Sequence, residues 1–213
     1  MIDLRKRVLS FVGEPAKPLV EQFFNTDGPF AATTFDTLPD NEHNRFTTTD
    51  LLAVTLLDVA LPPPSVRSLL HTDADTFNGL LATVPDDVDL WDVSDEGLAH
   101  AEALYWALRK LHNVGRTRTS KLMARKRPRL IPVVDSVIIE ALNLGDDSWR
   151  ALRACLSDAE VRASIEACRP DNAPTKSISI LRLLDAAVWM RCSQSRHAKN
   201  ARKATGLTGR NPY

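Results

Sequence analysis

The chain has 213 residues, of which 44% are hydrophobic, and equal numbers of basic and acidic side chains, 27 of each. This length and composition predict an ordinary folded domain with a real core and exclude collagen-like, disordered and disulfide-rich chains. The zero net charge hides an asymmetry, because residues 1–102 carry 6 basic and 18 acidic side chains and residues 103–213 carry 21 and 9. We expect part of the surface to attract a polyanion. The alternative is that the two charged halves neutralise each other across an internal interface.

The three cysteines are Cys155, Cys168 and Cys192, and no pair has the spacing of a metal site or of a disulfide framework. Free or buried thiols in a reducing cytoplasm are expected, without a metal or another cofactor. The N-terminus lacks the apolar core of a signal peptide, and no run is long enough to cross a bilayer. The sequence therefore predicts a cytoplasmic protein that does not bind membranes.

Apolar residues recur at helical spacing along most of the chain, without the alternation of a sheet, so an all-α fold is predicted. Residues 1–46 contain several prolines and predict an N-terminal arm that packs on a helical core over residues 47–192. The polar, basic residues 193–213 predict a flexible tail. Helices are expected over residues 4–12, 19–25, 51–59, 65–70, 75–81, 95–110, 119–127, 135–144, 149–156, 159–168 and 178–190.

The segment from Leu111 to Gly115 separates two of these helices and has the form of the turn in a helix-hairpin-helix. Gly115 permits a positive φ and leaves the backbone without a side chain. The amides of Asn113, Val114 and Gly115, at the start of the second helix, then provide a seat for a phosphate group. The alternative is an ordinary pair of helices with a solvated basic face.

The residues after the turn are strongly basic, since no acidic residue occurs between Glu102 and Asp135. These cations are expected to follow the DNA backbone with salt-dependent affinity. The predicted phosphate contacts are Arg116, Arg118, Lys121, Arg125, Lys126 and Arg127.

The hairpin and the later segment Pro132-Val133-Val134-Asp135 together resemble the helix-hairpin-helix DNA glycosylase superfamily, which includes endonuclease III and the alkylbase glycosylases. The resemblance covers roughly residues 98–145. It implies a two-lobed helical fold, double-stranded DNA as the partner of a monomer associated with the nucleoid, and Asp135 as the catalytic aspartate. Residues 121–128 also resemble an uncharacterised actinobacterial family.

The departures from the superfamily pattern narrow the expected activity. Thr117 stands where bifunctional members carry a lysine, and threonine has no amine to form a Schiff base. The cysteines of the endonuclease III iron–sulfur cluster are absent. The resemblance therefore implies a monofunctional enzyme that hydrolyses the N-glycosidic bond and leaves an abasic site. The wedge that fills the gap of the flipped base is not identified, and Leu61 is a candidate.

Asp135 has two interpretations. A carboxylate there would stabilise the positive charge that develops on the sugar and orient the attacking water. Aspartate before Ser-Val-Ile-Ile is also a good N-cap, and the two roles are compatible. Tyr105, Trp106 and His43 are candidates for a pocket that holds the flipped base, or else core residues.

Three functions remain open at this point. The first is excision of a damaged base in DNA repair, or of a hypermodified base of phage DNA in antiviral defence. The second is non-catalytic binding of double-stranded DNA through the hairpin. The third is a helical protein-interaction domain in which the charge asymmetry drives association.

Overall fold

The computed structural model describes residues 3–171 and 178–207, and every regular element within these ranges is a helix. The prediction of an all-α protein is thereby confirmed. The chain forms two compact units: unit 1 comprises residues 1–33 and 134–213, and unit 2 comprises residues 34–133. This division corrects the predicted boundaries, because the first 33 residues belong with the C-terminal part of the chain and not with a core over residues 47–192.

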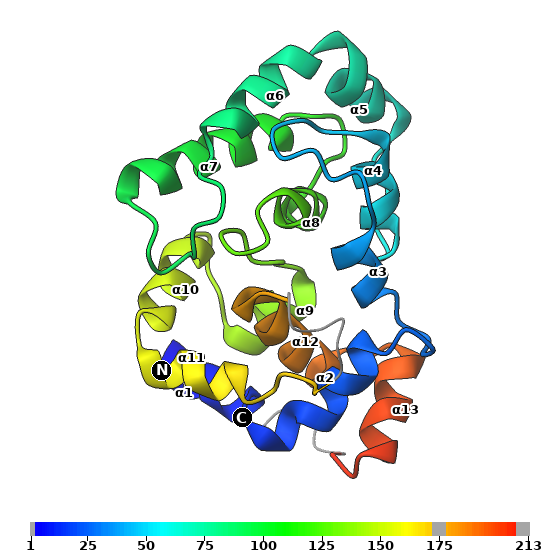
Figure 1. Cartoon of the computed structure of the whole chain (residues 1–213), viewed down its shortest axis with the longest axis vertical. Helices are drawn as coiled ribbons and strands as arrows, with labels where there is room; N and C mark the ends of the chain where they lie inside the picture. The colour runs from blue at the N-terminus through cyan, green and yellow to red at the C-terminus, as the bar shows by residue number, and fades with distance from the viewer. Residues whose placement is uncertain (1–2, 172–177, 208–213) are drawn as a thin grey trace. The chain divides into compact units, whose positions relative to one another are not determined.

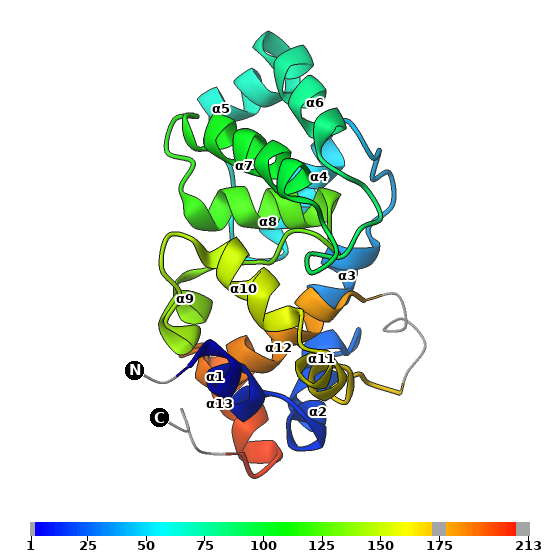
Figure 2. The same ribbon diagram turned by 90° about the vertical axis from the view of Figure 1, so that its left-hand side faces the viewer.

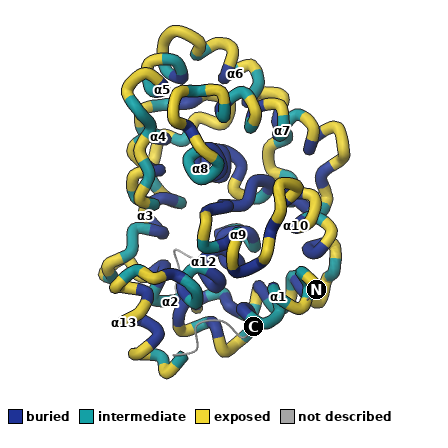
Figure 3. The backbone as a smooth tube through the Cα atoms, turned by 180° about the vertical axis from the view of Figure 1, so that it is seen from behind, coloured by how far each residue is buried: buried dark blue, intermediate teal, exposed yellow. Residues whose placement is uncertain are grey.

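Unit 1 is built around α12 (Ile180–Cys192), whose residues from Leu181 to Val188 are all buried. A helix buried on every side needs neighbours all round, and α12 packs against α1, α2, α9, α11 and α13. Figure 3 shows the buried stretches in dark blue. The bounds in unit 1 are α1 (Leu4–Phe11), the 3₁₀ turn η1 (Glu14–Ala16), α2 (Lys17–Phe24), α9 (Ser136–Leu142), α10 (Ser148–Leu156), α11 (Ala159–Glu166) and α13 (Arg196–Ala204).

The predicted flexible tail is wrong for residues 196–204, which form α13. Ala198 and Ala201 are buried on its inner face. The buried Arg202 donates to the carbonyl oxygens of Met190 at 2.6 Å and Ser193 at 3.0 Å. The prediction failed because the basic composition of this segment suggested full solvation. Its alanines form a narrow apolar stripe, and one of its arginines binds backbone carbonyl groups inside the unit. Residues 208–213 of the predicted tail lie outside the described residues.

Unit 2 surrounds α8 (Arg116–Lys126), which packs against α4 (Thr48–Thr55) and α7 (Asp95–Arg109). Figures 1 and 2 show α7 beside both α6 and α8. At the start of α4, Thr47 and Asp50 form a reciprocal capping box. The remaining helices are α5 (Pro63–Arg67), the π-helical turn η2 (Ser68–Thr72) and α6 (Ala74–Thr83); α3 (Ala32–Thr37) contains the change from unit 1 to unit 2.

No helix in the described ranges has both the length and the apolar character needed to span a bilayer.

The thiols of unit 1 provide a test of its packing. Burial raises the pKa of both Cys155 and Cys168 to about 11, whereas Cys192 is only half-buried. We expect iodoacetamide at pH 8 to alkylate Cys192 first, because the thiolate is the reacting species. The two raised pKa values stabilise the fold fully below the ordinary value of 9.0, and this contribution is lost as pH rises through about 11. Mass spectrometry of the labelled sites checks the order; equal labelling of all three would contradict it.

Candidate nucleic-acid interface

The predicted hairpin is present in unit 2. α7 ends at Arg109, α8 begins at Arg116, and the turn between them is closed by a hydrogen bond from the amide of Val114 to the carbonyl oxygen of Leu111 at 3.1 Å. Asn113 takes a left-handed conformation with φ 54°, as its residue type favours. Val114 is buried beneath the turn, so the exposed groups are those of His112, Asn113 and Gly115.

Gly115 differs from the prediction in one respect. Its φ is −86°, which any residue adopts, so the positive φ of the turn belongs to Asn113 alone. A Cβ built on Gly115 meets no atom within 4 Å among the described residues. Neither backbone conformation nor packing requires glycine here. Close approach of a ligand to the backbone is the other physical reason for a glycine.

Gly115 is also the N-cap of α8 and has no side chain to accept a hydrogen bond from the first turn. The first amides of a helix have no acceptor within the helix, and the macrodipole places partial positive charge at this end. The N-terminus of this 11-residue helix therefore favours an anion.

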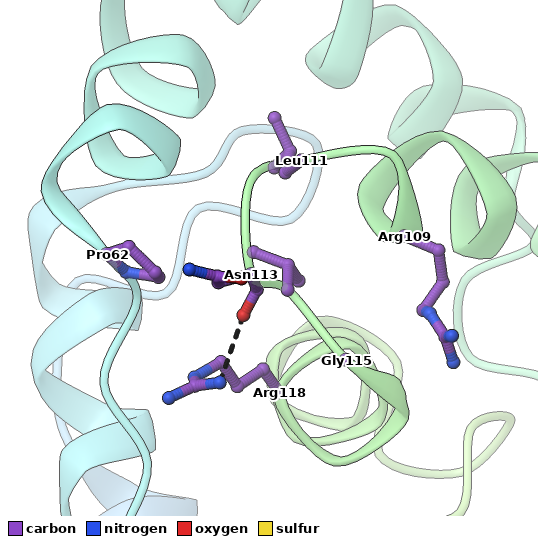
Figure 4. Close-up of a pocket in the computed structure, with 7 residues that line it drawn as sticks. Pro62, Arg109, Leu111, Asn113, Gly115 and Arg118 are labelled. Atoms are coloured by element: carbon purple, nitrogen blue, oxygen red, sulfur yellow. Dashed lines mark hydrogen bonds between the residues drawn. The ribbon is translucent and has the colours of Figure 1, made fainter.

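A hollow of about 600 Å³ opens beside this helix end and is lined by residues of both helices, the turn and the loop before α5 (Figure 4). Arg109, at the end of α7, and Arg118, in the first turn of α8, are among the residues that line it. The two guanidinium groups add positive charge to that of the helix end. The lining residues are Pro62, Arg109, Leu111, Asn113, Val114, Gly115 and Arg118.

Arg118 also fixes the shape of the turn. Its Nη1 donates to the carbonyl oxygen of Asn113 at 3.0 Å, the dashed line in Figure 4, and its Nε donates to that of Ala60 at 2.7 Å. The hydroxyl of Ser65 donates to the carbonyl oxygen of His112 at 2.7 Å. The hairpin is thus tied to the loop before α5 and to α5 itself, which preorganises its exposed amides.

The structure corrects the prediction for four of the basic residues. Lys121, Arg125, Lys126 and Arg127 are buried, and a buried cation that is already hydrogen-bonded cannot follow a DNA backbone. The ammonium group of Lys121 donates to the carbonyl oxygen of Leu57 at 2.7 Å. Arg116 and Arg118 remain half-exposed at the helix start and stay candidates for phosphate contacts.

Residues 125–127, at the end of α8, instead form hydrogen bonds with the backbone of the segment before α4. Arg125 donates to the carbonyl oxygens of Phe35 at 2.8 Å and Asp36 at 3.2 Å, and Lys126 donates to that of Glu42 at 2.9 Å. Arg127 donates to those of His43 at 2.6 Å and Leu81 at 2.9 Å. Burial lowers the pKa of all three groups. The carboxylate of Asp50 pairs with Lys126 and lies 3.7 Å from Nε of Arg125.

The three candidates for a base pocket lie on different segments of unit 2. Tyr105 and Trp106 contact each other on α7 with ring centroids 5.2 Å apart. His43 pairs with Asp86 and lines a cavity of about 350 Å³ whose other lining residues include Arg127 and Arg129. The three side chains stay candidates for contacts with a base.

Asp135 lies in unit 1, at the start of α9. Its Oδ1 accepts a hydrogen bond from the amide of Ile138 at 3.1 Å, which confirms the N-cap interpretation. The residue is 7% exposed. The helix ends at Leu142 with Asn143 in the left-handed conformation, two residues before the predicted end at Leu144.

Sequence reasoning did not identify Arg109 as a site residue. The feature that could have identified Arg109 is its position in the last turn of α7, directly before the hairpin. Among residues 3–171 and 178–207, no group of three or more His, Cys, Asp or Glu side chains is arranged to hold a metal ion.

No curated protein and no solved structure is significantly similar to the chain. A family model described as "Family of unknown function (DUF6308)" matches residues 16–192, which is most of the sequence. The chain belongs to this family.

Proposed function

We propose that the protein is a monofunctional DNA glycosylase, which removes a modified or damaged base from double-stranded DNA and leaves an abasic site. The observation that carries the proposal is the open start of α8, where an uncapped helix end and two arginines surround a glycine that the fold does not require. A phosphodiester fits such a site in charge and in the close approach it needs.

Asp135 supplies the carboxylate for the chemistry. Breaking an N-glycosidic bond builds positive charge on the deoxyribose, and a carboxylate stabilises that charge and orients the attacking water. The hydrogen bond from Ile138 to Oδ1 does not exclude this role, because a carboxylate has two oxygens and about four acceptor sites in all. The hydroxyl of Thr117 cannot form a Schiff base, so strand cleavage by a lyase step is not expected.

The substrate is a base that can leave the duplex, because a stacked base is out of reach of any side chain. Alkylated, oxidised and deaminated bases are candidates, as are hypermodified bases of phage DNA, for which the protein would act in defence.

The proposal is tested by incubating the protein with duplexes that each carry one such base, and with modified phage DNA. Released base is measured by mass spectrometry, and abasic sites by strand cleavage after heating in alkali. We expect cleavage only after the alkali treatment and only for some substrates. Cleavage without alkali would contradict the monofunctional assignment. The absence of abasic sites in every substrate would contradict the glycosylase.

Replacement of Gly115 tests the phosphate seat without disturbing the fold. Gly115→Ala meets no steric obstacle, and the gain from restricting the unfolded chain is offset because alanine is a poorer N-cap than glycine, so the free energy of unfolding should change by less than about 1 kcal/mol. Affinity for duplex DNA should fall about 10-fold, the equivalent of one hydrogen bond to a charged group. Gly79→Ala, at an exposed and equally open position of α6, is the matched control and should bind DNA as the wild type does. Unchanged affinity of Gly115→Ala would show that no phosphate approaches this amide.

The burial of Asp135 favours a second candidate. Asp135 is 7% exposed and caps α9, and this structural role is enough to explain an aspartate at this position. The protein would then be a non-catalytic DNA-binding protein that uses the hairpin alone. This function predicts salt-sensitive binding to duplex DNA and no abasic sites in the same substrate panel.

A further inference from the structure

Trp106 is an exposed aromatic side chain on the outer face of α7. Its exposed fraction is 59%, and Leu52, at 56%, is the other large hydrophobic side chain with this degree of exposure in the described residues. The inner face of α7 is formed by Leu98, Ala101, Leu104 and Leu108, all of them buried, so the packing of unit 2 does not use Trp106. An exposed tryptophan is among the residues most enriched at contact surfaces.

The indole ring is held in place by its neighbours. The ring of Tyr105 meets it edge to face, with the centroids 5.2 Å apart and an interplanar angle of 83°. Arg109 contacts the tyrosine of this pair, with its guanidinium carbon 5.8 Å from the centroid of the Tyr105 ring and Nη1 donating to the tyrosine hydroxyl at 3.2 Å. A ring fixed in this way loses little conformational entropy when it binds a ligand.

Arg109 connects the aromatic pair to the hairpin. It follows Trp106 by three positions on one helix, so the two side chains are neighbours on the same face. It also lines the hollow at the start of α8 together with Asn113 and Arg118. The positively charged start of α8, the guanidinium of Arg109 and the exposed indole of Trp106 therefore follow one another along the surface of unit 2. Groups of these kinds bind the phosphate and the base of a single DNA strand.

We propose that Trp106 stacks on an unpaired base of a DNA strand whose phosphate lies at the start of α8. The proposal rests on the function proposed above, in that DNA is the ligand of the hairpin, and it adds a contact to a base outside any catalytic pocket. The positive charge of Arg109 and Arg118 favours a polyanion over a second copy of this chain, which would bring the same arginines together.

The test compares the full-length protein with Trp106→Ala and Trp106→Phe, with fluorescence anisotropy of labelled DNA as the readout. The ligands are a single strand, a perfect duplex and a duplex with one unpaired base. We expect Trp106→Ala to bind the single strand and the interrupted duplex about 10-fold more weakly, as the loss of one base stack implies, and Trp106→Phe to recover most of this loss. Affinity for the perfect duplex should change less. Leu52→Ala, the other exposed apolar side chain, should bind all three DNAs as the wild type does.

The salt dependence separates stacking from charge. Trp106→Ala should leave the slope of log affinity against log salt unchanged, whereas Arg109→Gln should reduce it by about 1. In the wild type, the single strand should quench tryptophan fluorescence, and this quenching should be lost in Trp106→Phe, although Trp91, Trp149 and Trp189 remain.

Equal affinity of Trp106→Ala and the wild type for all three DNAs would overturn the stacking proposal. So would concentration-dependent dimerisation that Trp106→Ala abolishes, because the indole would then serve an interface between copies. Different results would contradict the stacking proposal and the glycosylase proposal. Base release with no effect of Trp106→Ala removes the stacking contact only, whereas a loss of single-strand affinity without base release from any substrate supports stacking and removes the glycosylase.

Discussion

Replacing Asp50 by alanine is expected to destabilise the protein by about 3–5 kcal/mol, the cost of removing one partner from a buried ion pair. Asp50 is 0% exposed and pairs with Lys126, which is equally buried, and it lies 3.7 Å from Arg125. The same carboxylate accepts from the amide of Thr47 at 2.8 Å and so completes the capping box of α4. Its loss removes the carboxylate that pairs with Lys126 and one of the two hydrogen bonds of the capping box.

The pH dependence of this variant follows from Lys126. Burial lowers the pKa of Lys126, and the hydrogen bond and charge of Asp50 act in the opposite direction. Without Asp50, the pKa of Lys126 in the folded protein falls further below the ordinary value of 10.5. At pH values between these two pKa values, the unfolded chain binds more protons than the folded protein does. Stability of Asp50→Ala relative to the wild type should therefore rise as pH increases through this window.

Denaturant unfolding at pH 7 and at alkaline pH measures both effects. Asp87→Ala removes an exposed carboxylate that pairs with Arg129 in the same unit, and as a surface ion pair it should cost about 0–1 kcal/mol. Asp50→Ala combined with Lys126→Met should recover part of the loss, since it leaves one unpaired cation fewer. An Asp50→Ala variant as stable as Asp87→Ala would show that the cations are satisfied by backbone carbonyls alone.

The starts of the helices were predictable because they depend on local chemistry. Asp135 caps α9 as the sequence indicated, and Thr47 and Ser94 cap α4 and α7 in the same way, since a short polar side chain before an apolar repeat acts within three residues. The positive φ of Asn113 follows from the same local preference.

The role of the basic run was not predictable, because it depends on contacts distant in the sequence. Residues 125–127 bind carbonyl oxygens of residues 35–43, more than 80 positions earlier in the chain. A charge pattern alone does not distinguish a solvated cation from one that binds backbone. The division into units was missed for the same reason, since residues 1–33 join a part of the chain that follows residue 133.

Only part of the candidate interface could be predicted from the sequence. The turn and its glycine are local features of the sequence. The contribution of Arg109 and the exposure of Trp106 depend instead on how α7 packs against α6 and α8. The buried face of α7 selects which of its aromatic and basic residues point outward. The periodicity of this helix gives Trp106 an outward position once Leu104 and Leu108 are placed in the core.

Asp135→Asn is expected to reduce the rate of base release about 10²–10³-fold on any substrate that the wild type accepts. Asparagine caps a helix as well as aspartate does, so the hydrogen bond from Ile138 and the unfolding midpoint should be retained. The affinity for DNA should not fall, because the substitution removes a negative charge that repels the phosphates. A fall in kcat with an unchanged KM would thus separate a catalytic carboxylate from a structural one.

Two further variants decide between the roles of Asp135. Asp135→Ala removes the cap as well as the charge and should lose about 1 kcal/mol of stability in addition to activity. Asp158→Asn changes the N-cap carboxylate of α11 in the same unit and should release base at the wild-type rate. If Asp135→Asn also retained that rate, the carboxylate would have only its structural role, and the water would have to be activated by another group. Loss of activity in Asp135→Asn alone, at unchanged stability and DNA affinity, is the pattern that a helix cap by itself does not produce.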